Sequence, residues 1–345
     1  MKVVNLTHNE VGVGIRGIGY YVPENKITNE DLSKMVDISD EWITKKIGIK
    51  ERYICNDNQA ASDLAIPAAQ MAIKNAGISA EDIDLIIMTT LTPDHSDPMT
   101  ANLIQHKLGA KNAAAFNMSI GGCPDSIFSI ATASQFITSG AYKTVLIVNA
   151  EVNSRLINWQ DRTTCVIFGD GAGAVLLQAT KKGCGILGFT INNDGSSYDV
   201  IHVKAGGSRM PASTEALEKR MNFLSMDGRK VWDFAVKVFP ESVKCVLDEL
   251  KINKDDLGLL VTHQANLNII KKGMDLLGLP MEKTHTTVQK YGNTTSASVP
   301  ITLAEACELG KVSPGDYVGL CAFGAGLAWG TVVMKWCKDD EFLLQ

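Results

Sequence analysis

The sequence lacks a surplus of basic residues. Its 33 Lys and Arg are outnumbered by 38 Asp and Glu, which gives the 345-residue chain a formal net charge of -5 at pH 7. Proteins that bind nucleic acids or membrane surfaces attract them with clustered Lys and Arg. We therefore expect neither a nucleic-acid partner nor a membrane partner.

Long apolar runs are missing as well. Stretches such as Val145–Val148 are much shorter than the roughly 20 residues that a membrane-spanning helix needs, so they are predicted to be buried strands. The first ten residues include Asn5, His8 and Glu10 without an apolar run of about seven residues, so no secretion signal is expected. These features predict a cytoplasmic protein.

The cysteines also lack the spacing of a metal or disulfide framework. There are eight, none of them in a C-x-x-C pair, and most lie inside apolar segments. We expect no metal site and no other cofactor, and most of these thiols should pack as small buried side chains. A reactive cysteine would need a special setting.

Strand-like and helix-like segments alternate along the chain, which is 45% hydrophobic and long enough to bury a large core. Residues 64–76 and 100–108 have the apolar spacing of helices, and Leu85–Met88 between them is typical of a buried strand. This alternation predicts an α/β fold.

One segment of the chain is similar to another. Residues 81–89 (EDIDLIIMT) resemble residues 255–263 (DDLGLLVTH), and after each the same order of helix, small-residue segment, helix and strand follows. Such self-similarity predicts two duplicated halves. The polar stretch at 178–183 marks the expected join, so the halves are residues 1–180, with a nucleophilic cysteine, and residues 181–345, with a histidine and an asparagine.

Cys123 is the candidate nucleophile. It stands at a predicted turn that leads into a buried helix over residues 126–139. Pro124 suits the first helical position because it has no N–H to leave unpaired, while Gly121 and Gly122 permit a close backbone approach. The electropositive start of a helix favours thiolate over thiol. The alternative is a cysteine that only packs in the core.

His263 and Asn293 are the candidate partners of this cysteine. His263 follows a predicted strand at 257–261, where side chains leave the functional edge of an α/β sheet, and Asn293 lies in a turn rich in Gly, Ser and Thr. Alone, each would be read as structural. With a thiolate that carries an acyl group, imidazole and carboxamide can donate to the enolate oxygen that forms when a malonyl thioester loses carbon dioxide.

Several motifs together resemble the β-ketoacyl-acyl-carrier-protein synthase III family of the thiolase superfamily, over nearly the whole chain. They are the cysteine helix and residues 40–43 (DEWI), 168–174 (FGDGAGA), 263–266 (HQAN), 292–294 (GNT) and 323–330 (FGAGLAWG). The resemblance implies a thiolase-like five-layered αβαβα fold, a homodimer, and a catalytic triad of Cys123, His263 and Asn293.

The resemblance also implies a tunnel for coenzyme A, which enters as a thioester substrate. The implied contacts are Trp42, Lys46, Arg162, Gly228, Trp232 and Asn266. Trp42 and Arg162 would sandwich the adenine, a stacking arrangement that suits an aromatic ring and a guanidinium. Phe323 would aid decarboxylation, and the loop containing Ala325 would face Cys123 and hold the oxyanion with the Cys123 N–H.

We therefore expect transfer of an acyl group from coenzyme A to Cys123, then decarboxylative condensation with a malonyl thioester, with malonyl-acyl-carrier-protein favoured. The products would be a 3-oxoacyl thioester and carbon dioxide. Two alternatives stay open. The chain could be a specialised-metabolite relative that uses another acceptor or acylates an oxygen or nitrogen nucleophile, or a silent partner of an active ketosynthase.

Four departures from the family pattern concern the substrate or the carrier protein. Residues 120–125 (IGGCPD) replace an alanine-rich run and the Ala-Gly after the cysteine, and Asp97 replaces an apolar residue that reaches the partner subunit's acyl pocket. Lys46 stands for a common Arg, and Asp233 and Asn268 stand where basic residues usually dock the carrier protein. The triad is kept, while the acyl group and the carrier stay open.

Overall fold

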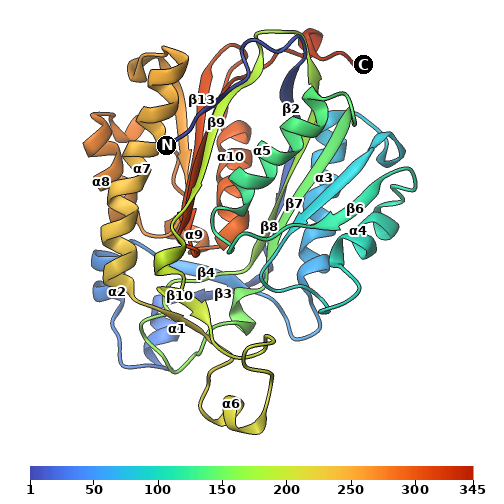
Figure 1. Cartoon of the computed structure of the whole chain (residues 1–345). Helices are drawn as coiled ribbons and strands as arrows, with labels where there is room; N and C mark the ends of the chain where they lie inside the picture. The colour runs from blue at the N-terminus through green and yellow to red at the C-terminus, as the bar shows by residue number, and fades with distance from the viewer. Residues whose placement is uncertain (345) are drawn as a thin grey trace.

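The computed structural model describes residues 1–344 as two five-stranded sheets with helices between and outside them (Figure 1). The first sheet has the order β2-β8-β7-β5-β6. Its strands are β2 (Gly12–Tyr21), β8 (Gly171–Thr180), β7 (Thr144–Glu151), β5 (Leu85–Thr89) and β6 (Ala114–Asn117). β7, β5 and β6 run parallel, and β8 is antiparallel to both of its neighbours.

The second sheet repeats this arrangement. Its order is β1-β9-β14-β13-β12, in which β12 and β13 are parallel and β14 is antiparallel to both neighbours. The strands are β1 (Val4–Asn5), β9 (Gly185–Asn193), β14 (Ala328–Lys335), β13 (Tyr317–Gly324) and β12 (Leu257–Thr262). Four strands of each sheet correspond in order and direction, so the predicted duplication of the α/β fold is confirmed.

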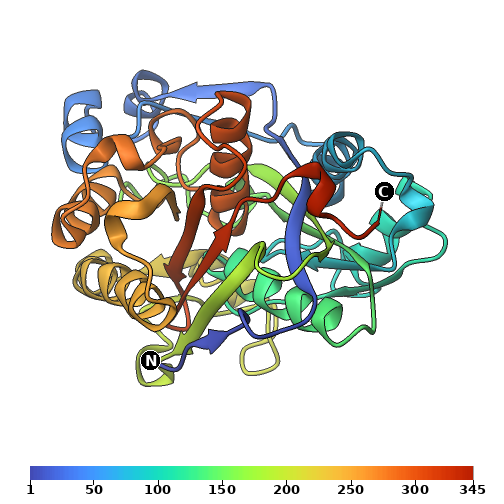
Figure 2. The ribbon, with the colours of Figure 1, turned by 90° about the horizontal axis from the view of Figure 1, so that it is seen from above.

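Helices form three layers around the two sheets (Figures 1 and 2). The central helices are α5 (Asp125–Thr138) and α10 (Ser298–Glu308), and α5 contacts strands of both sheets. On one outer side lie α3 (Ala61–Ala76) and α4 (Thr100–Leu108), and on the other α7 (Gly228–Leu250) and α8 (Leu267–Leu277). The order is therefore helix, sheet, helix, sheet, helix.

Small residues allow the outer layer to approach the first sheet closely. The buried face of α3 is made largely of alanines, and it packs on β2. A Cβ at Gly17 of β2 would lie 2.2 Å from the carbonyl oxygen of Ala72, and one at Gly19 would lie 2.3 Å from that of Ala68. Only glycine permits this contact between helix and strand backbones.

The chain crosses from one sheet to the other between β8 and β9. Each terminus also contacts the sheet that the other part of the chain forms. β1, near the N-terminus, joins the second sheet, and the backbone N–H of Leu343, near the C-terminus, donates to Ala179 of β8 in the first sheet. The division of the chain into halves at residue 180 stays a prediction. No helix within residues 1–344 has both the length and the apolar character to span a bilayer.

Short elements lie at and below the lower ends of the long strands in Figure 1. They are β3 (Asn25–Thr28), α1 (Asn29–Ser33), α2 (Asp40–Lys46), β4 (Glu51–Ile54), β10 (Ile201–Val203), α6 (Thr214–Glu218), β11 (Leu224–Met226) and α9 (Val288–Tyr291). Residues of α2, β10 and β11 help to line the principal cavity of the molecule.

Candidate active site

A cavity of about 1180 Å³ receives side chains from both sheets and from the short elements. The residues predicted for the site that line it are Cys123, His263, Asn293, Phe323, Ala325, Trp42, Arg162, Gly228, Trp232 and Asn266. Among the described residues that line the cavity, Lys46 and Asp97 are missing. The fold thus brings together residues that lie as far apart in the sequence as α2 and β13.

Cys123 occupies a tight turn just before α5 and is partly exposed to the cavity. Gly121 and Gly122 have φ of 144° and 95°, values that suit glycine, and the backbone N–H of Asp125 donates to the carbonyl of Gly122 over 2.9 Å. Pro124 caps the helix and Asp125 is its first residue. Pro124 was predicted to be the first residue of the helix. It is instead the residue before it, because the hydrogen bond from Asp125 to Gly122 forms a turn that ends at the start of the helix.

The loop after β13 faces this turn, as predicted. A Cβ at Gly324 would lie 2.6 Å from the Cβ of Cys123, and a Cβ at Gly121 would lie 2.8 Å from the carbonyl oxygen of Ala325. The two backbones approach this closely because both positions lack a side chain. The nucleophile candidate is therefore held between its own glycine turn and the glycine of the facing strand end.

Asp125 is fully buried behind the cysteine turn. Its Oδ1 accepts hydrogen bonds from the backbone N–H groups of Ile120 (3.1 Å) and Gly122 (3.0 Å), while Oδ2 is buried without a partner among residues 1–344. Burial raises the pKa of this carboxyl to about 7, against the lowering effect of the loop N–H groups. Asp125 therefore braces the turn that carries Cys123.

Glu151 is a second buried carboxyl near the cysteine, and the sequence reading missed it. It ends β7, where Oε1 accepts from the Ser296 hydroxyl (2.6 Å) and Oε2 from the Leu91 N–H (2.9 Å). Burial raises its pKa to about 8. The available signal was an acidic residue at the end of a strand whose centre, Val145–Val148, is apolar.

The predicted preference of Cys123 for thiolate is wrong for the resting protein. Burial raises the pKa of its thiol, and the carboxyls of Glu151 and Asp125 raise it further, while a hydrogen bond from Asn293 opposes them. Desolvation, the largest cause, outweighs the helix dipole, whose contribution is typically below about 2 kcal/mol. Cys123 is therefore a protonated thiol near neutral pH.

His263 lies at the end of β12 and is almost completely buried. Its backbone N–H donates to Cys321 of the adjacent strand (2.8 Å), and its Nδ1 forms a 2.7 Å hydrogen bond with the Ser298 hydroxyl. Burial lowers its pKa to about 3, so the imidazole is neutral near pH 7. The Phe323 ring packs edge-on against it at 5.5 Å between centroids. The free Nε2 is then the chemically available atom.

Asn293 is held by the start of the FGDGAGA motif and by Ile167 just before it. Its backbone N–H donates to Ile167 (2.9 Å) and its carbonyl accepts from Gly169 (3.1 Å), where a Cβ would lie 2.3 Å from the Tyr291 carbonyl. The side-chain Oδ1 accepts from the N–H of Thr295 (2.8 Å), which leaves Nδ2 as a donor. Thr295 has a φ of 49°, which is an unfavourable conformation for a β-branched residue. This conformation places the Thr295 N–H where it donates to Asn293.

The predicted coenzyme A contacts surround the mouth of the cavity. Trp42 on α2 is 46% exposed, and the Arg162 guanidinium donates to the Asp37 carbonyl over 3.1 Å. Asn266 caps α8, and its Nδ2 donates to the Lys46 carbonyl over 3.3 Å. Lys46 thus holds the Asn266 side chain through its carbonyl, while its own side chain is exposed.

Two of the departures noted in the sequence lie outside the cavity wall. Asp97 is exposed on the loop between β5 and α4, so its assignment to an acyl pocket stays a prediction that concerns a second copy of the chain. Asn268 donates to the Lys46 carbonyl over 2.9 Å, which ties α8 to the end of α2. The Asn268 side-chain amide is therefore engaged in a contact within this chain.

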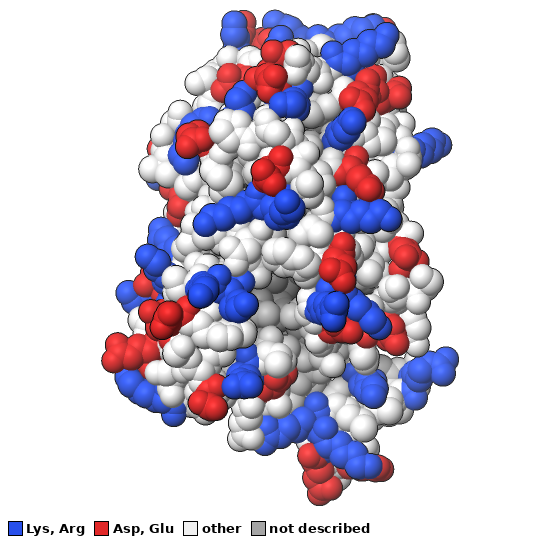
Figure 3. Space-filling model, turned by 90° about the vertical axis from the view of Figure 1, so that its left-hand side faces the viewer, with Lys and Arg blue, Asp and Glu red and all other residues white. Residues whose placement is uncertain are grey.

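The mouth opens on a face with many basic side chains. Figure 3 shows a hollow on the side of α2, α7 and α8, with Lys and Arg on either side of it. Exposed basic residues on these helices are Lys45, Lys46, Arg229, Lys230, Lys237, Lys244, Lys271 and Lys272. The same helices also carry exposed acidic residues, among them Asp233 and Glu241, so this face presents charges of both signs.

Asp125 leads to a pH-dependent prediction. Because its pKa rises from 3.8 in the unfolded chain to about 7, the folded protein keeps a proton that the unfolded chain has lost. The free energy of unfolding therefore falls as the pH rises from about 4 to about 7, by an amount on the order of 4 kcal/mol. Asp125→Asn keeps the acceptor oxygen but cannot ionise. We expect its free energy of unfolding, from urea titrations, to fall less than the wild type's between about pH 4 and about pH 8.

The control is Asp97→Asn, since Asp97 is exposed. Its unfolding free energy should follow the wild type. Glu151 keeps its own contribution of the same sign in both variants. Parallel pH curves for Asp125→Asn and the wild type would contradict the assignment.

Solved structures with this architecture define the class of protein. A 3-oxoacyl-[acyl-carrier-protein] synthase III from Aquifex aeolicus is 40% identical, with a TM-score of 0.87 over 94% of this chain and 100% of that chain. A priming β-ketosynthase from the R1128 polyketide biosynthetic pathway is 29% identical, with a TM-score of 0.87 over 95% of this chain and 97% of that chain. The chain therefore has the thiolase-like five-layered α/β fold of the condensing enzymes.

Sequence relatives give the family. The β-ketoacyl-[acyl-carrier-protein] synthase III of Caldanaerobacter subterraneus is 46% identical over 95% of this chain and 99% of its own length. That of Symbiobacterium thermophilum is 45% identical over 94% and 98%. Models of 3-oxoacyl-[acyl-carrier-protein] synthase III and of its C-terminal part match residues 118–195 and 247–336. The chain belongs to the β-ketoacyl-[acyl-carrier-protein] synthase III family, as the motifs predicted.

Proposed function

We propose that the chain catalyses the decarboxylative condensation of an acyl-coenzyme A primer with malonyl-acyl-carrier-protein. The observation that carries the proposal is the presence of the Cys123 thiol, the neutral His263 imidazole and the Asn293 amide donor in one cavity with a mouth flanked by basic residues. A nucleophile that holds the acyl group and two donors for an enolate oxygen are the parts that this reaction requires.

The first step is acyl transfer to Cys123. Its sulfur attacks the thioester carbonyl, the bond from this carbonyl to the coenzyme A sulfur breaks, and the proton of Cys123 ends on the departing coenzyme A thiol. The raised pKa of Cys123 means that this proton is still present when the primer binds. The backbone N–H groups of Cys123 and Ala325 are proposed to hold the tetrahedral oxyanion, because the two loops meet at Gly121 and Gly324.

The second step is decarboxylation and condensation. Loss of carbon dioxide from the malonyl group leaves an enolate, whose oxygen accepts hydrogen bonds from Nε2 of His263 and Nδ2 of Asn293. The enolate carbon then attacks the acyl-Cys123 carbonyl. Collapse of the adduct breaks the carbon–sulfur bond, releases the 3-oxoacyl product and leaves a thiolate that takes up a proton. The Phe323 ring beside His263 keeps this region apolar, which favours loss of the carboxylate charge.

Donation from Nε2 requires one tautomer of His263. The Ser298 hydroxyl lies 2.7 Å from Nδ1 and 3.5 Å from the backbone N–H of Gln264. When Ser298 accepts from Gln264 and donates its own proton to Nδ1, the hydrogen of the neutral imidazole resides on Nε2. Ser298 is therefore proposed as the positioning residue for His263.

The stacking role of Trp42 is tested by its truncation. We expect Trp42→Ala to raise the KM for acyl-coenzyme A by roughly tenfold, because stacking of one base on an aromatic ring contributes about 1–3 kcal/mol. Since the ring lies at the mouth, kcat should change little. Tyr198→Ala, at another exposed aromatic residue, should leave both constants unchanged. A fall in kcat with constant KM for Trp42→Ala would contradict the stacking role.

The remaining partner assignments rest on the family and on the sequence. A homodimer would cover the loop that carries Asp97 and the 43% exposed Met99. A carrier protein, which is acidic according to the family resemblance, would dock on the basic side chains of Figure 3. The cytoplasmic location and the independence from a cofactor stay predictions.

The decisive experiment separates the proposed reaction from its alternatives. Purified protein is incubated with a panel of acyl-coenzyme A primers, and the acyl group on Cys123 is identified by peptide mass spectrometry. Malonyl-acyl-carrier-protein is then added and carbon dioxide release is measured. We expect acylation followed by stoichiometric carbon dioxide. Discharge to an oxygen or nitrogen acceptor without carbon dioxide would favour the specialised-metabolite relative, and an unreactive Cys123 would favour the silent partner.

A further inference from the structure

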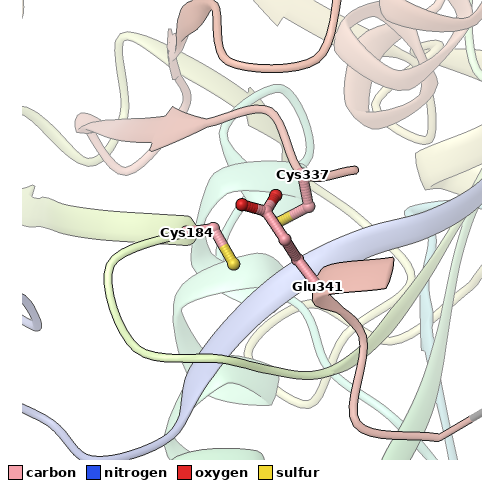
Figure 4. Close-up of side chains that lie close together, drawn as sticks. All are labelled: Cys184, Cys337 and Glu341. Carbon is pink, nitrogen blue, oxygen red and sulfur yellow. The ribbon is translucent and has the colours of Figure 1, made fainter. Parts of the chain in front are cut away.

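Cys184, Cys337 and Glu341 bring three metal-binding side chains together outside the cavity (Figure 4). One sulfur from each cysteine and one carboxylate oxygen all lie within 4.8 Å of one another. Cys184 lies just before β9, while Cys337 and Glu341 follow β14 in the C-terminal tail. The cluster therefore lies where the tail meets the connection between the two sheets.

The glycines of β2 leave room for this cluster. A Cβ at Gly14 would lie 2.8 Å from the Cys337 sulfur, and a Cβ at Gly12 would lie 2.5 Å from the Cys184 carbonyl. Cys184 is 4% exposed, and Cys337 and Glu341 are half-buried, which leaves one open side. The thiols are thus enclosed in a partly open recess.

The present hydrogen bonds of the thiols are ones that a cation could replace. The Cys184 thiol donates to the Lys181 carbonyl (3.2 Å) and the Cys337 thiol to the Lys335 carbonyl (3.7 Å). Glu341 uses Oε2 to accept from the Lys338 N–H (2.7 Å) and retains a second oxygen.

We propose that Cys184, Cys337 and Glu341 bind one Zn²⁺ ion, with water as the fourth ligand. Two thiolates and one carboxylate are a ligand set that suits this cation, with Zn–S distances of about 2.3 Å and Zn–O distances of about 2.0–2.2 Å. Ligands of a tetrahedral ion then lie roughly 3.5 to 3.8 Å apart. The three atoms, already within 4.8 Å, need only a small inward movement.

Binding of Zn²⁺ releases one proton from each of the two cysteine thiols. Two S–H bonds are replaced by two Zn–S bonds, and both protons pass to solvent. The ion would clamp the tail, which is already joined to β8 through the Leu343 N–H (3.0 Å) and to Lys181 through the Glu341 carbonyl (2.8 Å). The site is independent of the proposed condensation, because none of its three residues lines the cavity.

The test titrates reduced, metal-free full-length protein with Zn²⁺ against a chromophoric chelator. We expect one equivalent to bind, two protons to be released and the thermal midpoint to rise. Cys184→Ser and Cys337→Ser should each weaken Zn²⁺ binding at least tenfold, and Glu341→Gln should weaken it less. Cys245→Ser and Cys123→Ser are the controls and should bind as the wild type does.

A second measurement uses the wild type alone, in case a variant fails to fold. Zn²⁺ should protect Cys184 and Cys337 from a maleimide, mapped by peptide mass spectrometry, and leave Cys245 unprotected. Equal labelling of the pair with and without Zn²⁺, loss of binding in Cys123→Ser, or unchanged binding in Cys184→Ser would each overturn the proposal. A Cys184–Cys337 disulfide that forms readily in place of Zn²⁺ binding would overturn it as well.

Discussion

Replacement of His263 or Asn293 by alanine is expected to lower condensation at least about 100-fold while acylation of Cys123 persists. Removal of one donor to a developing oxyanion commonly costs about 10²–10³ in kcat. Both side chains are buried donors at the cavity, with Nδ1 of His263 and Oδ1 of Asn293 already engaged. The donor atoms Nε2 of His263 and Nδ2 of Asn293 are therefore expected to act on the malonyl group, whose decarboxylation is the step lost.

The measurement follows the two steps separately. Carbon dioxide release from malonyl-acyl-carrier-protein reports the second step, and the mass shift of Cys123 with acyl-coenzyme A reports the first. His285→Ala is a matched control, because His285 is also buried but pairs with Glu305 outside the cavity. If both His263→Ala and Asn293→Ala lost acylation, this division of labour would be refuted.

Gly324→Ala is expected to slow acylation of Cys123 about 100-fold in a folded protein. The added Cβ would lie 2.6 Å from the Cys123 Cβ and 3.1 Å from Cδ of Pro124. Pro124 is rigid and β13 is paired on both sides, so the cysteine turn has to move. A displacement of about 1 Å at a reacting group can cost about 10²-fold in rate.

Gly195→Ala is the matched control for this prediction. Among the described residues, no heavy atom lies within 4 Å of a Cβ added at Gly195, and its φ is not positive. Quenched-flow mass spectrometry of acyl-Cys123 gives the rate, and circular dichroism verifies that each variant is folded. A normal acylation rate in folded Gly324→Ala would mean that the facing loop does not hold the nucleophile.

Much of the fold was predictable because its signals are local. Apolar periodicity predicted the bounds of α3, β5 and α4 to within three residues. The periodicity arises because a helix or a strand buries the side chains of one face in the core, and these recur at a fixed spacing in the sequence. The similarity of residues 81–89 and 255–263 reflects β5 and β12, which occupy corresponding places in the two sheets. The class of fold therefore followed from short segments.

The candidate site was predictable where its residues lie within recognisable sequence motifs. Cys123, His263 and Asn293 stood out through their neighbours in the sequence, and the cavity contains all three. Their catalytic roles stay predictions. The ionisation of Cys123 was predicted in the wrong direction, because the helix start is visible in the sequence whereas burial and the carboxyl of Glu151 are not.

The sequence by itself determined the α/β class, the duplication and the family motifs, and it singled out Cys123 as the candidate nucleophile. Only the tertiary structure decided which groups lie around the candidate site: the carboxyl of Asp125 beneath the turn, Ser298 against His263, and Gly324 against Cys123. It also brought Cys184, before β9, to Cys337, after the neighbouring strand β14. The physical reason is that hydrophobic periodicity and turn chemistry act between near neighbours, whereas desolvation and close contact depend on segments that only folding brings together.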